Sequence, residues 1–88
     1  MSRVYKVKEQ CHLSDLKLNQ KAKVLALHNE NKALKRRLLD MGITKDVIVT
    51  IKKIAPLLDP VDIELRGYEL CLRLEDMKNI DVEVIEWK

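Results

Sequence analysis

The residues of this chain that could carry out chemistry are few and scattered. The two histidines, His12 and His28, flank a predicted strand, and we find no carboxylate at helical spacing from either. Cys11 directly precedes His12, and adjacent ligands rarely both reach one ion, while Cys71 lacks a second cysteine at Cys-x-x-Cys spacing. There is no phosphate-binding Gly-x-x-x-x-Gly-Lys-Ser/Thr loop and no serine in a nucleophile turn. We therefore expect no enzyme activity, no metal site and no cofactor.

Side chains suited to binding a partner form a clearer pattern. Arginine beside an apolar anchor is the usual composition of a binding hot spot. A basic run occupies the first half of a predicted helix, where the helix dipole disfavours cations, so helix stability does not explain it. This run is either a solvated surface or a patch for an acidic partner. The candidate partner-binding residues are Lys35, Arg36, Arg37, Leu57, Leu58, Arg66, Tyr68 and Arg73.

A short amphipathic helix would position the basic run. Leu34, Leu38 and Met41 recur at helical spacing and define its apolar face. Asn31 is suited to cap the helix start, and Gly42 to take the left-handed conformation that ends it. The two leucines of the candidate set lie elsewhere, in a loop with two prolines, where they either contact a partner or fold back to close one end of the core.

Alternating apolar residues predict five short strands around this helix. They cover residues 21–27, 47–54, 61–65, 68–74 and 80–84. Arg66-Gly67 supplies a tight hairpin turn, and the register then places Cys71 on the polar face of its strand. A single turn at residues 13–16 plugs one end of the core. The expected fold is mainly β with one inserted helix, curled into a small barrel over residues 13–88. Residues 1–12 are either a tail or an added edge strand.

Composition narrows the possible functions further. The 88 residues fit one domain, with an aliphatic core because only 3% are aromatic. The 17 basic residues are interleaved with 14 acidic ones, so the net charge of +3 is mild, and aromatic stacking platforms are lacking. We do not expect nucleic-acid binding. The absence of a long apolar window or signal peptide, and only two cysteines, predict a cytoplasmic protein with free thiols and no direct membrane insertion.

The chain resembles the FeoA family. The resemblance rests on residues 33–43, on Ala55-Pro-Leu and Asp59-Pro60, and on Arg66-Gly-Tyr-Glu-Leu70 followed by Leu72-Arg73; it extends from about residue 13 to residue 84. It implies an SH3-like barrel, a fold also found as the C-terminal domain of some iron-dependent repressors. The matching positions are Leu34, Arg36, Arg37, Leu38, Asp40, Met41, Gly42, Pro56, Leu57, Asp59, Pro60, Gly67, Tyr68 and Arg73, most of them expected to build the fold. The family usually has more glycines than the two found here.

The resemblance also implies a function. FeoA proteins are small cytoplasmic components of bacterial ferrous iron uptake that act on FeoB, a large membrane protein with a cytoplasmic GTPase domain. We therefore expect a non-enzymatic module that docks on a FeoB-type GTPase and ferrous iron transporter, modulates it, and is held at the inner face of the membrane through that partner. The alternative is a stand-alone relative of the repressor domain that acts through a regulator or by self-association.

Overall fold

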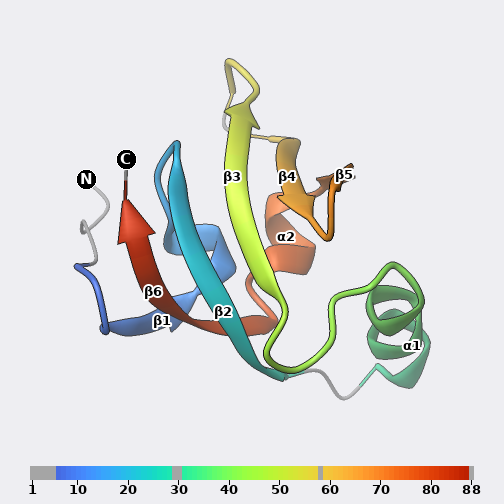
Figure 1. Ribbon diagram of the computed structural model, residues 1–88. Helices are drawn as coiled ribbons and strands as arrows, with labels where there is room; N and C mark the ends of the chain where they lie inside the picture. Colours follow the sequence, from blue (N-terminus) through green and yellow to red (C-terminus); the bar gives the residue numbers. More distant parts are fainter. Residues whose placement is uncertain (1–5, 29–30, 58, 88) are drawn as a thin grey trace.

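The computed structural model describes residues 6–28, 31–57 and 59–87. Six strands form one antiparallel sheet in the order β1-β6-β2-β3-β4-β5 (Figure 1). The strands are β1 (Gln10–His12), β2 (Gln20–Leu27), β3 (Ile48–Ile54), β4 (Val61–Leu65), β5 (Tyr68–Leu72) and β6 (Ile80–Trp87). The 3-10 helix η1 (Leu13–Asp15) follows β1, α1 (Lys32–Asp40) follows β2, and α2 (Leu74–Met77) precedes β6. None of the helices in these ranges is long and apolar enough to cross a membrane.

The predicted arrangement of strands around one inserted helix is confirmed, with differences at its margins. All five predicted strands are present, β4 with the predicted boundaries and the other four with shifted ones, and β1 adds a sixth strand that pairs with β6. The predicted turn at residues 75–79 is instead largely the short helix α2. Residues 1–5 of the predicted tail lie outside the described residues.

The strand β5 ends two residues earlier than predicted. Apolar alternation continues through Leu74, which is why the sequence predicts strand there, but Leu74 begins α2. The carboxylate of Asp59 accepts a hydrogen bond from the Leu74 backbone N–H at 2.8 Å. Glu75 and Asp76 add negative charge to the first turn, where the helix dipole favours it. A hydrogen bond to Asp59, fifteen residues earlier in the chain, thus helps to begin a helix at Leu74 where the local pattern predicts strand.

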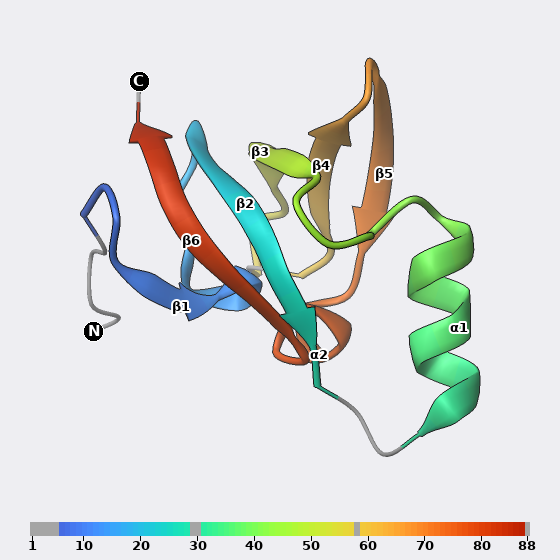
Figure 2. The same cartoon turned by 60° about the horizontal axis from the view of Figure 1, so that its bottom comes forward.

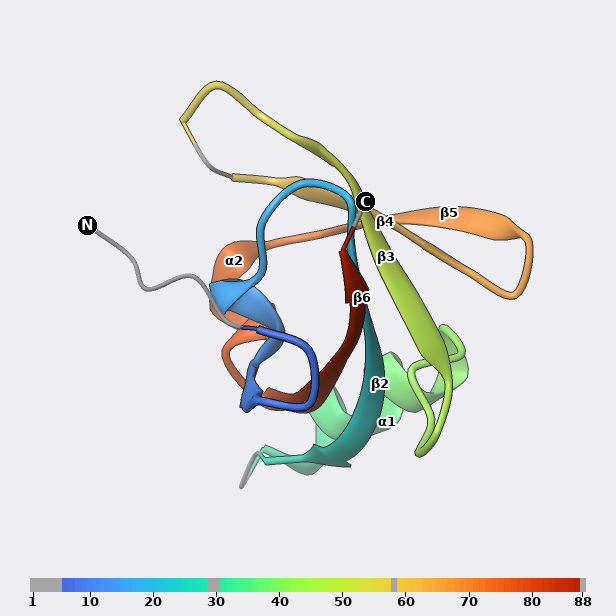
Figure 3. The same cartoon turned by 60° about the vertical axis from the view of Figure 1, so that its left-hand side comes forward.

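The sheet curves around its core without closing into a barrel (Figure 3). β1 and β5 are the two ends of the strand order, and they do not pair with each other over the described residues. Register shifts after Lys21 and Val24 in the β2–β6 pairing, and after Ile51 in the β3–β4 pairing, help to bend the strands. The expected curling is therefore present, but it leaves two free edges.

The core is aliphatic, as the composition predicts. Strands β2, β4 and β6 bury alternate side chains, and the predicted turn η1 buries Leu13 completely. Met77 of α2 and Leu38 of α1 close the remaining sides. The fully or nearly fully buried apolar residues are Leu13, Leu16, Ala22, Val24, Leu38, Ile43, Val47, Val49, Ile51, Val61, Ile63, Leu65, Leu72, Met77, Ile80, Val82 and Val84.

Both predicted ends of α1 are confirmed. The Asn31 side-chain oxygen accepts hydrogen bonds from the backbone N–H groups of Ala33 at 3.0 Å and Leu34 at 3.2 Å. These bonds satisfy two of the free donors at the helix start. Gly42 has φ +96°, the left-handed conformation that ends the helix. The helix lies beside β5, well away from β1 (Figure 2).

The predicted hairpin between β4 and β5 is also confirmed. Arg66 and Gly67 both have positive φ, at 51° and 84°, which is the pattern of a two-residue type I′ turn. Leu65 and Tyr68 are therefore opposite each other at the start of the ladder. With this register Cys71 is exposed on the polar face of β5, as predicted.

Candidate functional site

Three of the candidate partner-binding residues have partners within the chain. Arg37 of α1 donates a hydrogen bond to Asp76 of α2, with 3.2 Å between Nη2 and Oδ2. Arg66 donates to the hydroxyl of Thr44 at 2.9 Å, and the Tyr68 hydroxyl donates to the backbone carbonyl of Met41 at the end of α1. These contacts join α1 and the loop after it to the β4–β5 hairpin and to α2. The structure thus gives all three side chains a role in placing the helix.

The remaining described candidates face solvent. Lys35 and Arg36 of α1 and Arg73 at the end of β5 are exposed, and none of them forms an ion pair with another described residue. Leu57, in the loop between β3 and β4, is 89% exposed. Its neighbour Leu58 lies outside the described residues. The predicted basic run is therefore divided: Arg37 binds within the chain, while its two predecessors are available to a partner.

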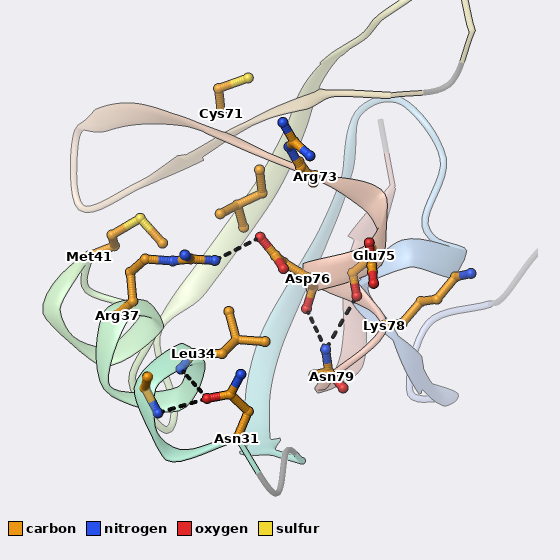
Figure 4. A pocket seen from close by; sticks show the side chains of 12 residues that line it. Asn31, Leu34, Arg37, Met41, Cys71, Arg73, Glu75, Asp76, Lys78 and Asn79 are labelled. Atoms are coloured by element: carbon orange, nitrogen blue, oxygen red, sulfur yellow. Dashed lines mark hydrogen bonds and ion pairs between the residues drawn. The ribbon is translucent and has the colours of Figure 1, made fainter.

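A groove separates α1 from β5 and α2 (Figure 4). It has a volume of about 1290 Å³ and is open to solvent. Its apolar lining comes chiefly from Leu34, Met41 and Leu72, and the Arg37–Asp76 pair spans it. The exposed fraction of the Arg37 side chain is 61%, so this ion pair contributes about 0–1 kcal/mol to stability. Sequence reasoning did not find the groove, because its lining residues extend from Asn31 to Asn79 and come from separate elements.

The two histidines meet one carboxylate, which the sequence analysis missed. His12 is the register partner of Asp81, and its Nε2 lies 3.4 Å from Oδ1 of that residue. The other carboxylate oxygen contacts Nε2 of His28. The expectation of no carboxylate at helical spacing was also wrong for His12, because Asp15 follows at i+3. The distance between His12 Nδ1 and Asp15 Oδ2 is 3.8 Å. No group of three ligating side chains in the described ranges could hold a metal ion.

Neither cysteine forms a disulfide bond in the structure. The pKa of Cys71 is raised above the usual thiol value by desolvation, by a hydrogen bond to Asp62, and by the negative charges of Asp62 and Asp59. Each of these effects disfavours the thiolate, which is the reactive form. The site around Cys71 therefore lacks the electropositive setting of a catalytic cysteine.

Comparisons with known proteins agree with the resemblance. The FeoA domain model matches residues 11–84. A fusion of Fe(2+) transport protein A with the Fe(2+) transporter FeoB from Porphyromonas gingivalis is 33% identical over 73 residues, which are 83% of this chain and 8% of that protein. The chain thus spans less than a tenth of the length of this relative.

Solved structures show the same fold. A FeoA-like protein from Clostridium acetobutylicum is 35% identical, with a TM-score of 0.82 over 91% of this chain and 92% of that one. The zinc complex of FeoA from Stenotrophomonas maltophilia, a prokaryotic SH3 domain protein, is 27% identical, with a TM-score of 0.72 over 82% and 88%. IdeR from T. acidophilum shares only the fold, at 17% identity and a TM-score of 0.76 over 93% of this chain and 37% of that one.

The expected SH3-like fold is therefore confirmed, in a form whose sheet is curved but open. The domain model covers every strand except the first residue of β1 and the end of β6, together with all the helices. The residues that suggested the resemblance lie within this match, and a curated relative and two solved structures point to the same family. On this evidence, the chain belongs to the FeoA family.

Proposed function

We propose that this chain is a non-enzymatic interaction module of ferrous iron transport, which docks on the cytoplasmic part of a FeoB-type transporter and modulates it. The observation that carries the proposal is the P. gingivalis relative, in which the two proteins form one polypeptide. Fusion of two proteins keeps each at a high effective concentration near the other. Such an arrangement favours domains that bind one another.

The exposed basic residues on α1 support an electrostatic contribution to docking. Lys35 and Arg36 face solvent in the middle of α1, where the helix dipole gives no reason for positive charge. Arg73 lines the groove, which Lys35 and Arg36 do not, and it adds a third exposed positive charge. An acidic surface on the partner would be attracted to this region, and the attraction would be screened by salt.

Leu57 provides an apolar contact of the kind that a docking surface needs. It is the most exposed large apolar residue among those described. Burying such a side chain fully at an interface contributes about 1.5–3 kcal/mol. The exposed basic residues would then orient the partner and increase its association rate, and Leu57 would contribute part of the affinity.

A binding titration with charge-reversed variants tests this proposal. The probe is the soluble cytoplasmic part of FeoB from the same organism, titrated by calorimetry at low and at moderate salt. Lys35→Glu with Arg36→Glu is expected to weaken binding at least tenfold at low salt, and less at moderate salt. Lys6→Glu with Lys8→Glu is the matched control, because it makes the same charge change at exposed positions in the segment before β1.

Equal weakening by both double variants would show that only net charge matters and would contradict this surface. No binding of the unmodified chain at either salt concentration would contradict the docking proposal itself. The regulator alternative rests on the likeness to IdeR, which is a likeness of fold alone. We therefore do not extend it to a function.

A further inference from the structure

The outer edge of β5 is free to pair with another strand. β5 is the last strand in the sheet order. In a two-residue hairpin the residues that flank the turn are hydrogen-bonded to each other, here Leu65 and Tyr68, and the bonding then alternates along the ladder. The backbone groups of Glu69 and Cys71 consequently point away from β4. No described residue pairs with them on this edge.

The groove beside α1 reaches the C-terminal end of this strand. Cys71 and Leu72 belong to its lining, and Figure 4 shows the Cys71 side chain pointing away from Arg37 and Leu34, so the strand backbone borders the groove. The groove's volume of about 1290 Å³ exceeds the roughly 300–1,000 Å³ of typical small-molecule pockets. Its size and open form suit a segment of polypeptide better than an enclosed small ligand.

The charges at the α2 end of the groove favour an acidic occupant there, whereas Asp59 and Asp62 make the surroundings of Cys71 negative. Three basic side chains line it, Arg37, Arg73 and Lys78, against two acidic ones. The Arg37–Asp76 ion pair neutralises one charge of each sign, which leaves Arg73 and Lys78 against Glu75. Lys35 and Arg36 are exposed on α1 but do not belong to the groove lining. A segment with a carboxylate at the end beside α2 would meet complementary charge from Arg73 and Lys78.

We propose that an extended segment of the partner protein, apolar at alternate positions and carrying a carboxylate at the end beside α2, adds to the free edge of β5 within this groove. Strand addition of this kind obtains affinity from backbone hydrogen bonds and specificity from alternate side chains. Leu34 and Met41 would contact the apolar positions, and Arg73 a carboxylate. The inference rests on the proposed function for the identity of the partner, and it adds the mode of docking and the chemistry of the docked segment.

Amide hydrogen exchange measured by NMR tests this mode directly. The isotope-labelled chain is compared alone and with the soluble cytoplasmic part of FeoB from the same organism. Binding is expected to slow exchange of the Glu69 and Cys71 amides at least tenfold. The amides of Gln10 and His12 belong to β1, at the opposite end of the sheet, and should exchange unchanged.

A proline substitution provides a second, independent measurement. Cys71→Pro removes an outward N–H while sparing the β4 ladder, and proline is tolerated on edge strands. It is expected to weaken binding about tenfold, whereas the matched Cys71→Ala variant should bind as the unmodified chain does. Retention of the NMR spectrum outside β5 would show that Cys71→Pro still folds; if it does not, the exchange measurement decides alone.

The outcomes separate this inference from the proposed function. Binding without slowed exchange at Glu69 and Cys71 would overturn strand addition and leave docking intact. Normal binding by a folded Cys71→Pro variant would do the same. Absence of any binding by the unmodified chain would overturn the proposed function, and the docking mode with it.

Discussion

Replacing Gly42 with alanine is expected to destabilise this protein more than the same change at the other glycine. Gly42 ends α1 with φ +96°, and a Cβ built there would lie 2.5 Å from the Tyr68 hydroxyl oxygen. That hydroxyl donates a hydrogen bond to the Met41 carbonyl. The tyrosine ring can move away from an added methyl group only by giving up this bond. The substitution therefore carries two costs.

The magnitude follows from these two costs. A residue with a side chain pays about 1–2 kcal/mol in the left-handed region relative to glycine. Loss of the Tyr68 hydrogen bond adds about 0.5–1.5 kcal/mol. Gly42→Ala should therefore lower the free energy of unfolding by about 1.5–3.5 kcal/mol. For a domain of this size, each kcal/mol corresponds to roughly 4–8 °C in Tm, so we expect a fall in Tm of about 6–28 °C.

Urea unfolding followed by circular dichroism measures this difference, and the chain provides two controls. Gly67 also has positive φ, but a Cβ there would meet nothing within 4 Å. Gly67→Ala should therefore show the backbone cost alone, about 1–2 kcal/mol. In a Tyr68→Phe background the hydroxyl is absent, so Gly42→Ala should again cost only that amount.

Two results of this double-mutant comparison would contradict a role for the Tyr68 hydroxyl. If Gly42→Ala costs the same with Tyr68 and with phenylalanine at that position, the hydroxyl contact is not responsible for the excess. If Gly42→Ala is no more destabilising than Gly67→Ala, the close approach of Tyr68 to the helix end is not energetically significant. Either result would remove the argument that this tyrosine fixes the end of α1.

Three further predictions concern the helix start, a thiol and the histidine pair. Asn31→Ala should lower the free energy of unfolding by about 1 kcal/mol in urea titrations, because two capping hydrogen bonds are lost; an unchanged midpoint would contradict the cap. Because the pKa of Cys71 is raised, its thiolate is scarce near neutral pH. In a Cys11→Ser background, the rate of alkylation by iodoacetamide should therefore rise only at a higher pH than it does for a cysteine in a short peptide. Asp62→Asn should shift this rise to lower pH. Asp81→Asn should move the ring resonances of both histidines in NMR spectra, and movement of only one would show that the shared contact is absent.

The parts of the fold that depend on neighbouring residues could be predicted from the sequence. The cap at Asn31, the left-handed glycine after α1 and the hairpin at Arg66-Gly67 are all local, because each is determined within a few residues. The strands could also be predicted, because burial of one face of a strand makes every second residue apolar. Closure into a barrel could not be predicted in the same way, because it depends on whether two strands far apart in the chain meet.

The candidate site was less accessible to sequence reasoning. The basic run could be recognised, but its division into paired and exposed members depends on Asp76, thirty-nine residues beyond Arg37. The histidines were judged by helical spacing, whereas the pairing of β1 with β6 brings Asp81 to His12. Helix placement determines the Arg37–Asp76 contact and strand register the His12–Asp81 contact, and no local pattern reports either. The groove likewise exists only once α1, β5 and α2 have been placed together.

The internal contacts of the candidate residues explain how the fold could prepare a docking site. Arg37 and Tyr68 were selected as binding residues, yet both hold α1 in place, one through α2 and the other at the helix end. The helix buries Leu38 and packs Leu34 and Met41 against the core, and the two side-chain contacts add to this packing in setting its distance from β5. A groove whose width is fixed in advance costs a partner less entropy on binding. Substitutions at Arg37 and Tyr68 would therefore weaken docking through the position of α1, whereas those at Lys35, Arg36 and Arg73 would act by direct contact.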